Sequence, residues 1–123
     1  MPFIICHLRT LVLILFFVSC STTQSRFVPL GPTHESKPTD CSLEVIRTGT
    51  PSKDFIKISR IDVHVERTYY IRSGFDDALP ELRIKACASG ADAIFEIQET
   101  SSKMIIGETH IYNVTATGIK YKE

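Results

Sequence analysis

The residues best suited to chemistry in this chain of 123 residues are its four cysteines and four histidines. A cysteine can carry a lipid, form a disulfide or bind a metal as thiolate, and histidine is the commonest metal ligand. The cysteines are Cys6, Cys20, Cys41 and Cys87. Because they form no CxxC pair, each must be interpreted from its own surroundings.

Cys20 follows an unbroken apolar run at residues 11–18, which Arg9 precedes. A basic start, a short apolar stretch and small residues at the cut are typical of a secretory signal. The run is too short for a permanent membrane span, which takes about 20 apolar residues. We therefore expect residues 1–19 to be a signal that directs the chain out of the cytoplasm.

The residues at the end of this signal resemble the motif at which bacterial lipoproteins are acylated and cut before the cysteine. Val18, Ser19 and Cys20 match that motif, whereas Phe17 stands where leucine is usual. We therefore expect acylated, palmitate-bearing Cys20 to be the first mature residue and the attachment to the bilayer, since several acyl chains bind a membrane stably.

Two alternatives to acylation remain open at this stage: free secretion after cleavage at Ser21, and an uncleaved anchor. By the sorting rule of Gram-negative lipoproteins, an aspartate after the acylated cysteine retains the protein at the inner membrane. Because Ser21 occupies that position, the motif predicts an outer-membrane protein that faces the periplasm.

Cys41 and Cys87 form the pair that remains once Cys6 has left with the signal and Cys20 has taken the lipid. In an oxidising compartment an even pair favours a disulfide. On a helical wheel Cys87 lies off the apolar stripe that contains Leu82, so we expect a bond at the helix flank. The alternative is two free buried thiols.

The histidines suggest a metal site only weakly. His34, His64 and His110 remain in the mature chain, but no HxxxH spacing joins them, and zinc requires four converging ligands. His64 lies between Asp62 and Glu66 on the polar face of an expected strand, and His110 lies on a possible neighbour. We keep His64 and His110 as candidates for the alternative function, a metal-binding envelope lipoprotein.

The pattern of apolar residues predicts one α+β domain, a two-layer sandwich of one main helix on a mostly antiparallel sheet of about four strands. A parity change at Ser59-Arg60 predicts a β-bulge there. The expected strands lie at residues 42–47, 55–67 and 93–98, and residues 105–121 are expected to form one long final strand or a hairpin. The helix is expected at about 76–89.

The helix is expected to begin with a capping box formed by Ser73 and Asp76 and to end at Gly90. Pro80 is tolerated only in a first turn, so the regular part should begin near Ala78.

The chain divides into a signal at residues 1–19, a lipidated flexible tether at 20–39 and a globular domain at 40–123. The tether is predicted from Pro29, Pro32 and Pro38 among polar residues, a composition that buries little. Removal of residues 1–20 leaves 13 basic and 14 acidic residues, a balance that argues against nucleic acid as a partner.

Three segments of the domain resemble a known family. They are Leu82-Arg83-Ile84-Lys85-Ala86-Cys87, which runs into Gly90-Ala91-Asp92-Ala93-Ile94, and Val114-Thr115-Ala116-Thr117-Gly118-Ile119. Together with Cys41, these segments resemble envelope lipoproteins related to the Rcs stress-sensor lipoprotein and the YbjQ-like families over about residues 41–121. The resemblance implies a domain that acts through protein partners without catalysis.

No catalytic motif opposes this expectation, since the chain has no phosphate-binding glycine loop, GxSxG or HExxH. We therefore expect no enzyme and no cofactor, but a sensor or structural module that binds other envelope proteins. Aromatic and arginine side chains often dominate interfaces, so the contact candidates are Arg67, Tyr69, Tyr70 and Arg72.

Overall fold

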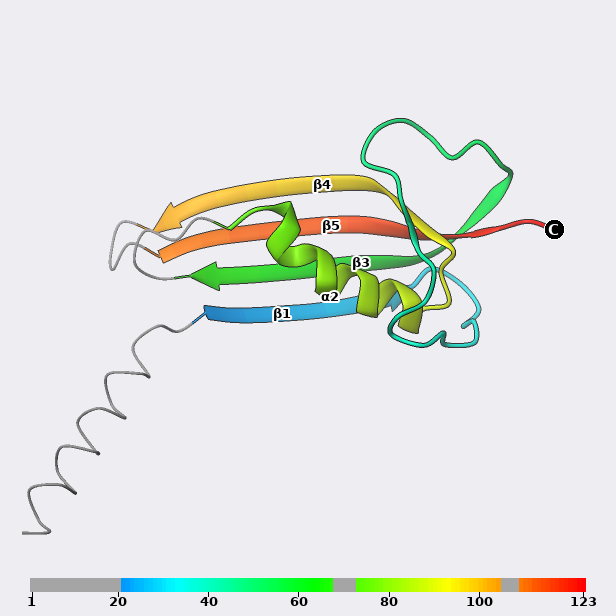
Figure 1. Ribbon diagram of the computed structural model, residues 1–123, viewed down its shortest axis with the longest axis horizontal. Coiled ribbons are helices and arrows are strands. Elements are labelled where there is room, and N and C mark those ends of the chain that lie inside the picture. Colours follow the sequence, from blue (N-terminus) through cyan, green and yellow to red (C-terminus); the bar gives the residue numbers. More distant parts are fainter. Residues whose placement is uncertain (1–20, 68–72, 105–108) are drawn as a thin grey trace, which may run out of the picture.

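The computed structural model describes residues 21–67, 73–104 and 109–123. In this part of the chain, one helix packs on one face of a five-stranded sheet, which confirms the α+β class with one strand more than expected (Figure 1). Neighbouring strands are antiparallel except for the parallel pair β2 and β4. The strand order is β1-β3-β5-β4-β2, and the elements are β1 (Ser21–Pro29), β2 (Glu44–Val45), β3 (Phe55–Arg67), α2 (Phe75–Ala88), β4 (Ala93–Met104) and β5 (Thr109–Tyr121).

Strand β1 lies within the segment expected to be a flexible tether, so that expectation is wrong for residues 21–29. The strand pairs with β3 from Ser21 opposite Arg67 to Pro29 opposite Ser59, and Phe27 packs against the core. Pro29 stands at the last position of an edge strand, where a missing N–H is tolerated. The described fold therefore includes residues from Ser21 onward, well before Asp40.

The following segment has no regular secondary structure until β2, but it is bonded to the end of the helix. The Lys37 N–H donates to the Cys87 carbonyl at 2.8 Å. The strand expected at residues 42–47 is reduced to the two residues of β2, which pair with Ala93 and Ile94.

Helix α2 begins one residue earlier than expected and is capped by different residues. Gly74 is the N-cap, and its N–H donates to the Asp77 carboxylate at 2.8 Å. Pro80 lies inside the helix rather than in its first turn, which corrects the expected start near Ala78. Proline removes one backbone bond, the one that residue 80 would donate to the Asp76 carbonyl.

The C-terminus of α2 is closed by Gly90, as the sequence predicts. The Gly90 N–H donates to the Cys87 carbonyl at 3.0 Å and the Ala91 N–H to the Ala86 carbonyl at 3.0 Å. This pair of bonds is the Schellman motif, which requires a left-handed residue, and Gly90 has φ +85°. A Cβ atom at Gly90 would also lie 2.8 Å from the Glu35 carbonyl oxygen, so the space next to the cap is already filled.

The predicted bulge in β3 is confirmed, one residue before the expected position. The register between β3 and β5 shifts between Lys57 and Ser59, which leaves Ile58 as the extra residue. Ile58 is therefore buried in the same cluster as Ile61 and Val63, although its parity differs. The bulge explains why the apolar pattern of this strand changes parity.

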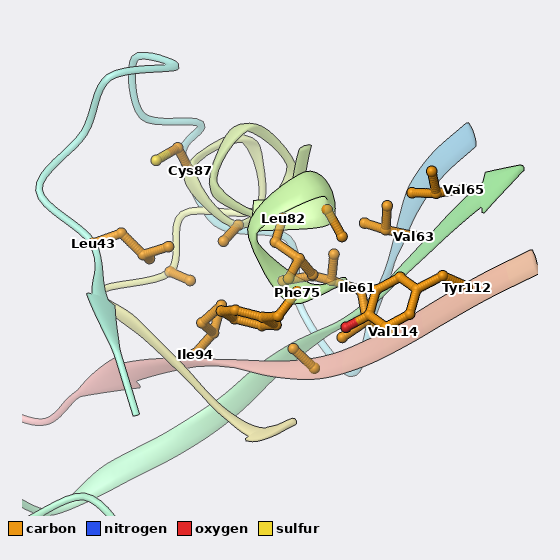
Figure 2. Close-up of a cluster of buried hydrophobic side chains, with 14 of the residues drawn as sticks. Leu43, Ile61, Val63, Val65, Phe75, Leu82, Cys87, Ile94, Tyr112 and Val114 are labelled. Atoms are coloured by element: carbon orange, nitrogen blue, oxygen red, sulfur yellow. The ribbon is translucent and has the colours of Figure 1, made fainter. Parts of the chain in front are cut away.

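The main core lies between α2 and the sheet (Figure 2). Phe75, Leu82 and Cys87 from the helix lie in one cluster with Ile61 and other residues of the central strands. The largest side chains in the cluster are almost fully enclosed; among them are Ile61, Leu82, Ile94, Val63, Val65 and Val114.

A second, smaller cluster lies at one end of the sheet and explains the mixed alternation of β5. Ile119, Phe95 and Ala93 are buried in it, apart from the main core that holds Val114 and Ala116. The Phe55 and Phe95 rings meet edge to face, with centroids 5.1 Å apart. Strand β5 thus contributes to two clusters.

Strand β4 also contains a bulge, and this one places a non-glycine residue in the left-handed region. The register shifts between Phe95 and Gln98, and Glu96 has φ +51°. The Glu96 carboxylate lies 2.7 Å from the Lys57 ammonium group, with both side chains about half exposed. An exposed pair of this kind contributes at most about 1 kcal/mol, whereas a left-handed residue with a Cβ costs roughly 1–2 kcal/mol.

We predict that Glu96→Gly is more stable than Glu96→Ala by about 1 kcal/mol in urea unfolding. Both variants lose the ion pair with Lys57, so the difference between them isolates the backbone conformation. Equal midpoints and slopes for the two variants would contradict a left-handed Glu96.

Candidate functional site

The structure joins Cys41 and Cys87 in a disulfide; their Cα atoms are 5.9 Å apart, and their sequence separation is 46. The pairing agrees with the expectation, and the alternative of two free thiols does not hold in this structure. The expected location at the helix flank is only partly right, because Cys87 is fully buried in the main core. In the chain-entropy model a loop of this length stabilises the fold by about 4 kcal/mol.

Asp92 lies just beyond the helix end and holds together four segments of the chain. Its carboxylate accepts bonds from the Lys37 ammonium group and, at 2.9 Å, from the Tyr121 N–H. Its N–H donates to the Ile119 carbonyl at 2.8 Å, and its carbonyl accepts from the Glu44 N–H at 3.2 Å. Asp92 thus connects the segment before β2, β2 itself, the helix end and β5.

Burial alone would raise the pKa of Asp92, but the bonds from Lys37 and from the Tyr121 N–H outweigh it and hold the pKa below the ordinary value of 3.8. A carboxylate with this set of partners is explained by its structural role. The turn Gly90-Ala91-Asp92, which is part of the family resemblance, is therefore accounted for by packing and hydrogen bonding.

The sheet face opposite α2 carries a shallow polar hollow. Its volume is about 850 Å³, and charged and amide side chains from adjacent strands meet there. Arg26 on β1 and Arg60 on β3 both approach the carboxylate of Asp62, at 3.3 Å and 3.8 Å. The residues that line the hollow are Gln24, Ser25, Arg26, Arg60, Asp62, Val63, His64, Thr100, Asn113, Val114 and Thr115.

Among the titratable side chains that line the hollow, His64 has the ordinary pKa closest to neutral pH. Its Nε2 atom lies 2.8 Å from Glu66 Oε1, and its Nδ1 atom lies 2.5 Å from Asn113 Oδ1. The bond to Glu66, and then the bond to Asn113, raise the pKa of His64 above 6.5, against a smaller effect of burial. Both ring nitrogens can donate only in the imidazolium form, so this arrangement favours a charged His64.

Of the other residues predicted as ligands or contacts, His110 and Arg67 are described by the structure, and neither lines this hollow. His110 pairs in register with Arg67, three positions along β3 from His64. Arg67 is itself paired with Asp77 at 2.7 Å. Tyr69, Tyr70 and Arg72 lie outside the described residues. Within the residues that the structure describes, no group of three histidine, cysteine or acidic side chains could hold a metal ion.

Sequence reasoning located His64 on the polar face of β3 but missed most of its neighbours. The signal that was present is the alternation of polar residues Arg60, Asp62, His64 and Glu66 at every second position. The partners from β1, β4 and β5 could not be found this way, because they depend on the register between strands.

No protein-family model and no curated protein matches the chain. Among solved structures, the chain is similar to the crystal structure of a Francisella virulence factor, FvfA, in the orthorhombic form. The two share 12% identity with a TM-score of 0.48, over 77% of this chain and 97% of that one.

Among the described residues, no helix is both long and apolar enough to cross a membrane.

We predict that the fold loses stability as pH rises from the unfolded pKa of histidine, about 6.5, through the higher folded pKa of His64. The contribution is fully present below about pH 6.5 and disappears above the folded value. NMR titration of the imidazole should give a pKa above 6.5, and His64→Gln should flatten the dependence of unfolding free energy on pH. A folded pKa at or below 6.5 would contradict the two hydrogen bonds.

Proposed function

We propose that this protein is a non-catalytic lipoprotein of the cell envelope, anchored through acylated Cys20, which acts by binding other envelope proteins. The observation that carries the proposal is the Cys41–Cys87 disulfide. Structural disulfides persist in oxidising compartments outside the cytoplasm. The bond therefore agrees with the export signal that ends at Val18-Ser19-Cys20, although the two features lie in different parts of the chain.

The position of strand β1 supports a lipid anchor at Cys20. Strand β1 begins at Ser21, the residue directly after Cys20. Cleavage before Cys20 would remove the whole apolar segment and leave every described residue of the domain intact. Outer-membrane residence, with the domain in the periplasm, follows from Ser21 at the sorting position.

A binding role is supported by the sheet face opposite α2, which presents donors and acceptors over several strands. Thr115, Asn113 and Gln24 offer uncharged hydrogen-bonding groups beside the paired charges of Arg26 and Asp62. A polar surface of this kind suits a protein partner that binds reversibly. We place the partner contact on this face, and Tyr69, Tyr70 and Arg72 remain additional candidates beside Arg67.

We predict that Cys20→Ala removes the protein from the membrane fraction, because no acyl chain remains to bind the bilayer. Cell fractionation measures the distribution, and intact-mass analysis of the wild type should show the acyl chains on a mature chain that starts at Cys20. Conservative Ser21→Thr serves as the control, since it preserves both the cysteine and the strand. A Cys20→Ala protein that still sediments with membranes at mature size would contradict the anchor.

We also predict that a photo-crosslinking amino acid at Thr115 captures an envelope protein in cells. The matched control is the same amino acid at Asp76, which is exposed on the helix side. Adducts at position 115 that are absent at position 76 would support the binding face. Identical adduct patterns at the two positions would contradict it.

A further inference from the structure

The exposed apolar side chains of the described residues gather on the strand that follows the proposed anchor. Val28, near the far end of β1, is 47% exposed, and Leu30, the residue directly after the strand, is 51% exposed. The Leu30 N–H donates to the Ile58 carbonyl at 2.9 Å, so the chain remains paired to β3 as far as this residue. Ile56 is 41% exposed but belongs to β3.

Strand β1 connects these side chains rigidly to Cys20. Its register with β3 is continuous from Ser21 to Pro29, without a bulge. At about 3.3 Å per residue, Val28 lies roughly 23 Å from Ser21 along the strand. A lipid on Cys20 therefore fixes one end of this edge strand at the bilayer, and Val28 and Leu30 stand at the other end.

The surroundings of Val28 suit a membrane interface. Val28 pairs with Arg60, and Arg26 precedes it by two positions on the same face of the strand. The side chains of Arg26 and Arg60 are 77% and 55% exposed, and both approach one acid, Asp62, so a positive charge remains in excess. Apolar side chains beside arginines fit the boundary between acyl chains and phosphate headgroups.

We propose that the protein lies with the β1 edge of its sheet against the bilayer, held at two points: the lipid on Cys20, and Val28 with Leu30 inserted at the headgroup boundary. The proposal rests on the proposed lipid anchor. The bilayer is favoured over a protein partner at this site because the same strand already starts at the membrane. In this orientation the sheet stands up from the surface, and the polar hollow faces sideways along the membrane.

The test places a fluorescent amino acid at position 28 in one protein and at position 56 in its matched control. The full mature protein, purified with its own acyl chains, is reconstituted in vesicles of phosphatidylethanolamine and phosphatidylglycerol. We expect nitroxide-labelled lipid to quench the probe at position 28 several-fold more than at 56, and aqueous iodide to quench it several-fold less. Equal quenching at the two positions overturns the proposal.

Two further measurements complete the test. The first distinguishes burial in the bilayer from contact with a second copy, and the second tests the lipid anchor separately from the orientation of the domain. If protection at position 28 disappears when the protein is diluted into excess lipid, a second copy covers the strand and the proposal fails. Intact mass is measured first. If it shows no acyl chains, the proposed function fails separately, and a chain produced to begin at Cys20, without the signal, is coupled through the Cys20 thiol to a maleimide lipid. The same quenching measurement then decides the orientation on its own.

Discussion

The junction at the C-terminal end of α2 is the constraint on which the rest of the structure depends. Within six residues it contains the disulfide at Cys87, the left-handed turn at Gly90 and the hydrogen-bonding centre at Asp92. The junction sets the direction in which β4 leaves the helix and also binds the segment before β2. A Cβ at Gly90 would lie 2.8 Å from the Glu35 carbonyl oxygen, so the segment that contains Glu35 can pack this closely on the helix end only against a residue without a side chain.

The sequence was informative where local signals and burial agreed. The helix, its glycine cap and the bounds of β3 could be predicted, because periodicity and a left-handed glycine act locally. The disulfide pair could be predicted for another reason: only two cysteines remain for the domain once Cys6 and Cys20 are assigned to the signal and the lipid. The β3 bulge was also visible, since Ile58 and Ile61 cannot share a face of a regular strand. These features determine the α+β class without knowledge of the register between strands.

The parts that could not be predicted depend on contacts between distant segments. Strand β1 is polar and carries a single residue, Phe27, that packs against the core, so its sequence resembles a linker. Its order comes from β3, which offers a free edge of matching length. The polar hollow was missed for the same reason, because Arg26, Asp62 and Asn113 come from three strands whose register the sequence does not reveal.

The order of β1 changes what an anchor at Cys20 can do. A flexible tether of 19 residues would let the domain search an r.m.s. distance of about 25 Å from the membrane. A paired strand removes that freedom, because the Cα of Ser21 lies about 3.8 Å from that of Cys20 and is already part of the sheet. A domain held in this way meets partners at the surface of its own membrane. Longer reach would require β1 to separate from β3, which would expose Phe27 and break the bond between Ser25 and Glu81. In the proposed anchored form, the distance that the domain can reach from the membrane is thus limited by the stability of one edge strand.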